Sequence, residues 1–206
     1  MGSASEVQGN RPALHRLGVV GAGNMGSGIA QKMATEGHPV VLVDVDQTQV
    51  ERGMQRITDT LAEAVERKLF QQEQAEAIRG LVQASTDFTA LADCDLVVEA
   101  VFEDLAVKQE VFRRLDQACA EKTILATNTS SFTVSELAQV TGRADRFLGL
   151  HYFYHPAKNR LVEVVPGEGT SQETLRAAWR LQEMLDKTPI HSEDAPGFIV
   201  NRYFVP

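Results

Sequence analysis

Short apolar runs alternate with helix-like segments along the chain from residue 17 onwards. Most of the apolar runs are hydrophobic at consecutive positions, which is typical of strands buried on both faces of a sheet. These runs cover residues 17–21, 39–43, 96–99, 123–126, 147–150 and 161–165. The segments between them carry apolar residues about four positions apart, as in Met25, Ile29 and Met33. This alternation predicts an α/β fold with a Rossmann-like, doubly wound, mostly parallel sheet.

Three further features predict helices. Val111, Phe112, Leu115 and Ala118 form an apolar stripe in a segment that opens near residue 104. The patterns Thr133-x-x-Glu136 and Thr170-x-x-Glu173 are capping boxes, in which a hydroxyl accepts from an amide of the first helical turn. Residues 47–80 are polar, favourable for helix and free of proline, and they predict one long helix or a helical hairpin projecting from the sheet.

Composition and charge narrow the class of protein. The 206 residues, 43% hydrophobic and 23% charged, suit one large globular domain. A formal net charge of −8 argues against nucleic acid or an anionic membrane as a partner. No apolar run approaches the roughly 20 residues needed to cross a bilayer, so we expect a soluble protein. Cys94 and Cys119 suit two packed thiols in a reducing cytoplasm, and a cysteine nucleophile is the weaker alternative.

A glycine-rich turn follows the first predicted strand and opens a helix. In this context the pattern predicts a dinucleotide site, because glycines allow a tight turn and a close approach of the backbone to a pyrophosphate. The expected cofactor contacts are Gly21, Ala22, Gly23, Asn24, Met25 and Gly26. Asp44, at the end of the second strand, would accept hydrogen bonds from the ribose diol and repel a 2′-phosphate, which favours NAD over NADP. A plain glycine turn and a surface aspartate are the alternatives.

A histidine and a glutamate stand at positions suited to acid–base chemistry. His151 directly follows a predicted buried strand, where an imidazole could take the proton of a secondary alcohol as hydride leaves. Glu163 interrupts the apolar run 161–165, where a carboxylate is costly unless it is paired. If the two strands are neighbours, Glu163 could orient the imidazole. Otherwise Glu163 faces solvent and His151 is a core histidine. We expect no metal site, since Pro156 prevents a helix that would join His151 to His155.

Several separated motifs, in order, give the chain a resemblance to the N-terminal domain of L-3-hydroxyacyl-CoA dehydrogenases. They are Gly21-Ala-Gly-Asn-Met-Gly-Ser-Gly-Ile-Ala30, Asp95-Leu-Val-Val-Glu-Ala100, Glu103, Lys108, Asn128-Thr-Ser-Ser131, Gly149-Leu-His151, Leu161-Val-Glu-Val164 and Pro196-Gly-Phe-Ile-Val-Asn-Arg202. Residues 1–16 are small, polar and aperiodic, and they predict a flexible leader. The resemblance implies an NAD-binding domain at 17–195. It also implies that residues 196–206 begin a helical dimerisation domain that is otherwise absent, so that the substrate site would be open.

The resemblance also implies a role for each matching residue. His151 corresponds to the catalytic base and Glu163 to its partner. Ser130 corresponds to a serine that hydrogen-bonds the reacting oxygen, and Asn201 to an asparagine of the same site. Contacts to the nicotinamide half of NAD are implied for Ala100, Glu103, Lys108, Asn128 and Ser130. The implied reaction is the NAD-dependent oxidation of a (3S)-3-hydroxyacyl-CoA, in fatty-acid β-oxidation or related metabolism, by a homodimer.

One segment departs from the family pattern. The family follows its histidine with two aromatic residues and Asn-Pro, whereas this chain has Tyr-Phe-Tyr-His-Pro at residues 152–156. Because this segment would border the acyl pocket, a carrier-protein thioester or a free hydroxy acid stays open as substrate. A protein that binds NAD without catalysis also stays open. Arg67 and Lys68 could contact CoA phosphates, although solvated helix charges are the simpler interpretation.

Overall fold

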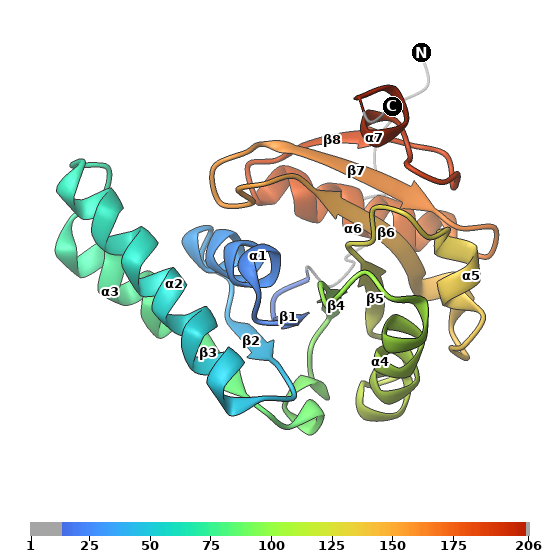
Figure 1. Cartoon of the computed structure of the whole chain (residues 1–206), viewed down its shortest axis with the longest axis horizontal. Helices are drawn as coiled ribbons and strands as arrows, with labels where there is room; N and C mark the ends of the chain where they lie inside the picture. The colour runs from blue at the N-terminus through green and yellow to red at the C-terminus, as the bar shows by residue number, and fades with distance from the viewer. Residues whose placement is uncertain (1–13, 205–206) are drawn as a thin grey trace, which may run out of the picture.

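The computed structural model describes residues 14–204, which form one sheet covered by helices on both faces (Figure 1). Within these residues the sheet has eight strands in the order β3-β2-β1-β4-β5-β6-β7-β8. The strands are β1 (Leu17–Val20), β2 (Val40–Val43), β3 (Val82–Ser85), β4 (Leu96–Glu99), β5 (Ile124–Thr127), β6 (Phe147–Tyr152), β7 (Leu161–Pro166) and β8 (Thr188–His191). Every neighbouring pair is parallel except β6 and β7. The predicted Rossmann-like, mostly parallel fold is confirmed.

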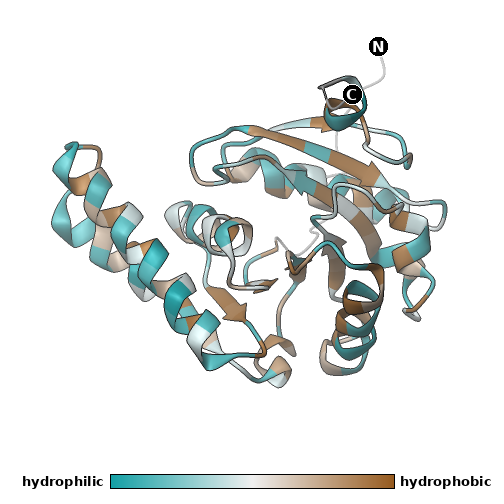
Figure 2. Ribbon diagram, in the orientation of Figure 1, coloured by the Kyte–Doolittle hydropathy of each residue, from teal (hydrophilic) through white to brown (hydrophobic). Residues whose placement is uncertain are grey.

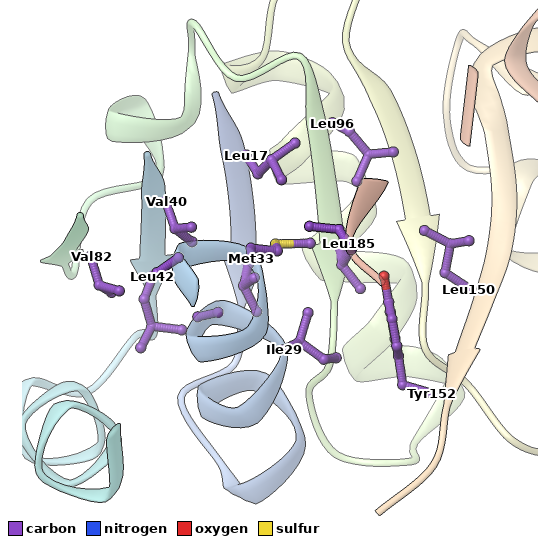
Figure 3. Close-up of a cluster of buried hydrophobic side chains, with 14 of the residues drawn as sticks. Leu17, Ile29, Met33, Val40, Leu42, Val82, Leu96, Leu150, Tyr152 and Leu185 are labelled. Carbon is purple, nitrogen blue, oxygen red and sulfur yellow. The ribbon is translucent and has the colours of Figure 1, made fainter. Parts of the chain in front are cut away.

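The hydrophobic core consists of two clusters, one on each face of the sheet, and different helices cover each of them. The helices are α1 (Asn24–Thr35), α2 (Gln47–Glu66), α3 (Gln72–Gly80), α4 (Leu105–Ala118), α5 (Val134–Ala138), α6 (Gln172–Met184) and α7 (Val200–Phe204), with 3₁₀ turns η1 (Phe88–Leu91) and η2 (Ala144–Arg146). The first cluster joins α1, α2, α3 and α6 to the sheet, and Figure 3 shows ten of its side chains labelled. The second cluster joins α4, α5 and η1 to the opposite face.

Residues 47–80 form a helical hairpin, which settles the alternative left open by the sequence. The hairpin of α2 and α3 extends away from the sheet in Figure 1, and the ribbon in Figure 2 shows many hydrophilic residues along it. Lys68 has a left-handed backbone, with φ of 59°, in the turn between the two helices. A Cβ atom on Gly53 would lie 2.8 Å from the carbonyl oxygen of Ala22, so glycine lets α2 approach the turn after β1 closely.

Four local expectations need correction. Thr133 caps α5 as predicted, but the cap of α6 is Ser171 and not Thr170. The Thr170 hydroxyl instead donates to the Phe147 carbonyl oxygen at 2.6 Å, so it belongs to the end of the sheet. The edge strands β3 and β8 were not predicted, because their residues are partly polar and exposed, without the apolar run that marks the inner strands. His151 lies inside β6 and not after it.

Two of the predictions from the sequence concern the ends of the chain. Most of the leader expected at 1–16 lies outside the described residues, which begin at residue 14. The helix expected near the C-terminal end is α7. None of the helices within residues 14–204 has the length and apolar character needed to span a membrane.

Candidate active site

The turn after β1 has the shape that a dinucleotide requires. Gly21 has φ of 102°, and a Cβ atom there would lie 2.5 Å from the Ala100 carbonyl oxygen. A Cβ atom on Gly26 would lie 1.7 Å from the Gly21 carbonyl oxygen, which only glycine avoids. A Cβ atom on Gly23 would contact nothing within 4 Å, so this side of the turn is open. The residues therefore fit a pyrophosphate placed against the backbone at the start of α1.

Asp44 and Arg56 hold the same turn from the side of β2 and α2. One carboxylate oxygen of Asp44 accepts from the Ala22 amide at 2.8 Å, and the other has only a long contact of 3.5 Å with the Asp46 amide. That second oxygen is therefore available to a ribose hydroxyl. The Arg56 guanidinium donates to the Ala22 carbonyl oxygen at 3.0 Å. The sequence analysis did not single out Arg56, because a contact across 34 residues leaves no local pattern.

A buried charge network lies where β4 ends. The Lys108 ammonium, 1% exposed, contacts Glu99 at 2.7 Å and Glu103 at 3.2 Å. Glu99 also accepts from the Val101 amide and from the Thr127 hydroxyl, both at 2.8 Å. Burial raises the pKa of the Glu99 carboxyl, against the opposing influence of the Lys108 charge. Glu99 belongs to the sequence motif at residues 95–100, but its central place in this network was not predicted.

Glu103 connects this network to the loop after β5. Its Oε1 atom accepts from the Thr129 hydroxyl and from the amides of Ser130 and Ser131, at 3.0 and 3.1 Å for the amides. Burial pushes the pKa of the Glu103 carboxyl upward, but the Thr129 hydroxyl and the Lys108 charge outweigh it, and the net shift is downward. The structure thus brings Glu103, Lys108 and Ser130 together, as expected for residues of one site.

Asn128 and Ala100 continue the backbone pairing beyond the ends of their strands. The side-chain oxygen of Asn128 accepts from the backbone amide of Tyr152 at 2.9 Å. The backbone amide of Asn128 donates to the Glu99 carbonyl oxygen at 2.8 Å. The Ala100 amide donates to the Val20 carbonyl oxygen at 2.7 Å. Both residues therefore lie at the carboxyl edge of the parallel strands, where ligands bind in open α/β sheets.

His151 and Glu163 form a buried hydrogen-bonded pair. They are directly opposite in the antiparallel register of β6 and β7, so their side chains lie on the same face. The Nδ1 atom of His151 lies 2.5 Å from Oε2 of Glu163, whose side chain is fully buried. The other oxygen, Oε1, accepts from the amides of Ile199 and Val200 at 2.9 Å each. The outward-facing alternative for Glu163 is therefore wrong.

Aromatic rings flank this pair. The ring centres of Phe153 and Phe198 lie 4.6 and 5.6 Å from that of His151. His151 is 6% exposed, so the protein keeps most of its surface from water. The pair combines a titratable imidazole with an acid that fixes one ring nitrogen, as general-base catalysis requires.

The remaining candidate residues lie further along the chain. Asn201 lies in the first turn of α7, next to Val200, whose amide binds Glu163. Arg67 lies at the end of α2, where it pairs with Glu63 at 2.5 Å. Lys68 follows it in the hairpin turn, and no contact places either residue in the network around His151. Within residues 14–204 no group of three or more His, Cys, Asp or Glu side chains has a metal-binding arrangement.

The segment that departs from the family pattern borders a polar cleft. This cleft, of about 360 Å³, lies between α1, α2 and the loop after β6. Its lining includes Asn24, Arg56, Thr60, Tyr154, His155 and Lys158. Tyr154 is 73% exposed, and Lys158 pairs with Glu63 of α2 at 3.3 Å. The loop and the hairpin therefore contact each other across one end of the cleft.

A dinucleotide-shaped turn and an imidazole–carboxylate pair at one edge of a Rossmann-like sheet define the class of nicotinamide-dependent dehydrogenases. Comparison with known proteins agrees. The family model described as "3-hydroxyacyl-CoA dehydrogenase, NAD binding domain" matches residues 16–195. The chain belongs to this family, and NAD is the cofactor of the family's domain.

Individual relatives extend the similarity over nearly the whole chain. It is 37% identical to a 3-hydroxybutyryl-CoA dehydrogenase of Clostridioides difficile, over 93% of this chain and 68% of that protein. It is 40% identical to the mitochondrial hydroxyacyl-coenzyme A dehydrogenase of Sus scrofa, over 99% and 67%. The crystal structure of (S)-3-hydroxybutyryl-CoA dehydrogenase PaaH1 from Ralstonia eutropha superposes with a TM-score of 0.91 at 36% identity, covering 93% and 68%. The chain thus spans about two thirds of these relatives.

Proposed function

We propose that this chain carries the cofactor site and the acid–base pair of an NAD-dependent enzyme that oxidises a (3S)-3-hydroxyacyl-CoA to the 3-ketoacyl-CoA. The observation that carries the proposal is the buried contact between His151 and Glu163 at the sheet edge that also holds the glycine turn. The names of the similar dehydrogenases support an acyl-CoA substrate.

His151 is the proposed catalytic base. Its Nδ1 atom faces Glu163, so the proton on Nδ1 is held there and Nε2 is left as an acceptor. Nε2 then takes the proton of the 3-hydroxyl group, and the buried carboxylate stabilises the imidazolium that forms. NAD, when bound, supplies the acceptor for the hydride that leaves C3.

The other site residues hold cofactor and substrate in the proposal. Residues 21–26 cradle the pyrophosphate and Asp44 binds the adenosine ribose. Ser130 and Asn201 orient the reacting oxygen. Ala100, Glu103, Lys108, Asn128 and Ser130 surround the nicotinamide half. Since Lys108 is buried and paired with two carboxylates, its contribution is to keep Glu103 and the loop after β5 in place.

The cleft between α1 and α2 adds two basic residues to the candidates for contacts with the CoA phosphates. Arg56 and Lys158 line this cleft, whereas Arg67 lines an adjoining hollow of about 140 Å³. Arg67 therefore stays a candidate for phosphate contacts at the outer end, and its exposed pair with Glu63 keeps the solvated interpretation open. Lys68 is the next residue in the hairpin turn and lines neither hollow, so its proposed phosphate contact rests on the sequence alone.

Side-by-side turnover tests the substrate. The whole protein is assayed with NADH and acetoacetyl-CoA, with the same acyl group on a carrier protein, and with free acetoacetate. We expect kcat/KM to be highest for the CoA thioester. Preference for the carrier-protein thioester or the free acid would transfer the proposal to that substrate. Binding of NAD without any turnover would favour a non-catalytic NAD-binding protein.

Two observations favour a second candidate substrate, a free hydroxy acid or ketone. Residues 152–156 depart from the family pattern at the cleft, and a structural neighbour at 30% identity and a TM-score of 0.89 is titled a diketoreductase that acts on dicarbonyl compounds. A free hydroxy acid or ketone would need no CoA contacts. Exchange of residues 154–155 for Asn-Pro tests this: improved turnover of acetoacetyl-CoA would show that these residues select against CoA thioesters.

Assembly, compartment and pathway are part of the same proposal. We infer a soluble homodimer formed through a C-terminal helical domain. Residues 196–206 are the proposed start of that domain, and α7 would be its first helix. The cytoplasm is the proposed compartment, although a similar protein is named mitochondrial. Fatty-acid β-oxidation or a related acyl-CoA pathway is the proposed context. The acidic net charge supports the absence of a nucleic-acid partner. Sedimentation of the whole protein with and without NAD measures the assembly.

A further inference from the structure

The segment between β8 and α7 is held at two points only a few residues apart. At its far end the amides of Ile199 and Val200 donate to Oε1 of Glu163, both at 2.9 Å. At its near end the carboxylate of Asp194 accepts from the Val134 amide at 2.6 Å and from Ser135. Asp194 thus fixes one end of the segment that supplies two of Glu163's hydrogen-bond donors.

The anchor at Asp194 is fully engaged. Its Oδ2 atom accepts from both the amide and the hydroxyl of Ser135, at 2.9 and 2.6 Å. The Ser135 hydroxyl in turn accepts from the Glu168 amide at 2.9 Å, in the turn after β7. The anchor therefore ties the segment to the start of α5 and to the end of the strand that carries Glu163.

The backbone between the two points is compact and permits little independent movement. The Phe198 amide donates to the Ala195 carbonyl oxygen at 2.9 Å. Gly197 and Phe198 both have left-handed backbones, with φ of 79° and 48°. Phe198 is 3% exposed and packs beside the imidazole of His151. A left-handed conformation at a bulky residue persists only where its surroundings enforce it, so a shift at Asp194 is passed on to residues 198–200.

We propose that Asp194 is a positioning residue for the reaction, acting through residues 195–200 to hold the carboxylate of Glu163 in line with His151. This inference rests on the proposed function of His151 and Glu163. A fully buried carboxylate needs its remaining oxygen satisfied by donors, and Ile199 and Val200 lie beyond the residues 16–195 that the family model matches. The acid–base pair therefore depends on the segment that leads out of the domain.

Two variants weaken the link at different points. Asp194→Asn keeps the size of the side chain but turns one acceptor into a donor, which faces an amide N–H. Val200→Pro removes one donor to Glu163 at the first position of α7, where proline is tolerated. We expect each variant to lower kcat by about 10- to 100-fold, since small misalignments of reacting groups have effects of this size. The KM for NAD stays unchanged in both.

A double-mutant cycle separates positioning from general structural support. If Asp194 acts through Glu163, then Asp194→Asn adds nothing to the loss already caused by Glu163→Gln. If the fold-loss in kcat of the double variant equals the product of the two single losses, the proposal is overturned. Asp87→Asn is the matched control, because the Asp87 carboxylate accepts from an amide at the start of η1 as Asp194 accepts from amides at the start of α5, but no hydrogen bond among the described residues links Asp87 to the segment that holds Glu163. We expect its kcat to equal that of the unmodified protein.

Hydrogen exchange gives a readout that does not need activity. The amide protons of Ile199 and Val200 should exchange slowly in the unmodified protein and much faster in Asp194→Asn. Fast exchange in the unmodified protein, or equally slow exchange in the variant, would reject the role of Asp194. Absence of hydride transfer by the unmodified protein, with slow exchange intact, would instead reject the proposed function. Exchange in folded Val200→Pro, read at Ile199, decides the case if Asp194→Asn does not fold.

Discussion

Two buried glutamates at the same edge of the sheet have different kinds of partner. Glu99, at the end of β4, faces the ammonium of Lys108 and accepts from a threonine hydroxyl and an amide. Glu163, in β7, faces the imidazole of His151 and accepts from two amides. The partner of Glu99 is thus a lysine, whereas the partner of Glu163 is a histidine, the residue type that most often transfers protons in catalysis.

The comparison favours a structural role for Glu99 and agrees with the catalytic role proposed for Glu163. Both are costly to bury, and in both cases hydrogen bonds offset that cost. Glu99 and Lys108 form a fixed-charge pair that orders the loop carrying Ser130, through Glu103. In the proposed function, the pair of Glu163 and His151 takes up the proton of the substrate hydroxyl group. A buried carboxylate is therefore the stronger catalytic candidate when its partner is a histidine, which ordinarily transfers protons near neutral pH, than when its partner is a lysine.

The largest expected effect is on turnover through His151. His151→Gln should lower kcat by on the order of 10²- to 10⁴-fold in the whole protein and leave NAD affinity nearly unchanged, because only proton abstraction is lost. Steady-state kinetics and NAD titration measure the two quantities. His38→Gln is a matched control, since His38 is also buried but bonds the His15 carbonyl oxygen on the other side of the molecule. Unaltered turnover in His151→Gln would exclude it as the base.

The next effect is on stability through Lys108. Lys108→Met leaves Glu99 buried without its cation and should lower the free energy of unfolding by about 3–5 kcal/mol. Urea denaturation measures this change. The double variant Glu99→Gln with Lys108→Met should recover part of the loss, because the uncompensated charge is gone. If Lys108→Met were as stable as the unmodified protein, the fixed-charge interpretation of this pair would fail.

A smaller effect is expected at Asp44, a carboxylate that is not buried. Asp44→Ala should raise the Kd for NAD by roughly 10-fold and reduce the preference over NADP, because a charged hydrogen bond to the ribose is lost. Isothermal titration with both cofactors measures it. Asp46→Ala removes the nearby cap of α2 without touching the ribose position and serves as the control. Equal NAD affinity in Asp44→Ala would mean that other residues hold the ribose.

The smallest effect concerns the two thiols. Burial raises the pKa of Cys94 to about 11 and that of Cys119 to about 12. At pH 8 both are protonated in the folded protein, so iodoacetamide should leave turnover unchanged, and alkylation should be rapid only in urea. Mass spectrometry follows the modification. Fast alkylation of the folded protein with loss of activity would revive a role for a cysteine.

Local patterns were sufficient for most elements and for the cofactor turn. Consecutive apolar residues identified the six inner strands of the sheet. The glycine pattern predicted a close approach of the backbone in the turn, and a Cβ atom on Gly21 or Gly26 would indeed clash with a carbonyl oxygen. The edge strands β3 and β8 were missed because their sequences are partly polar, and only their pairing with β2 and β7 defines them. The cap of α6 was misplaced by one residue because Thr170 bonds instead to the backbone of β6.

The amino-acid sequence by itself determined the class of fold, the dinucleotide turn and the identity of His151 and Glu163 as candidates, because those depend on periodicity and on residues close together in the chain. Only the tertiary structure decided that the two lie 2.5 Å apart. The same holds for Glu103 ordering the loop after β5, and for Asp194 and residues 199–200 reaching Glu163. These contacts join residues that are far apart in sequence, and the pairing of strands and the packing of helices bring them together.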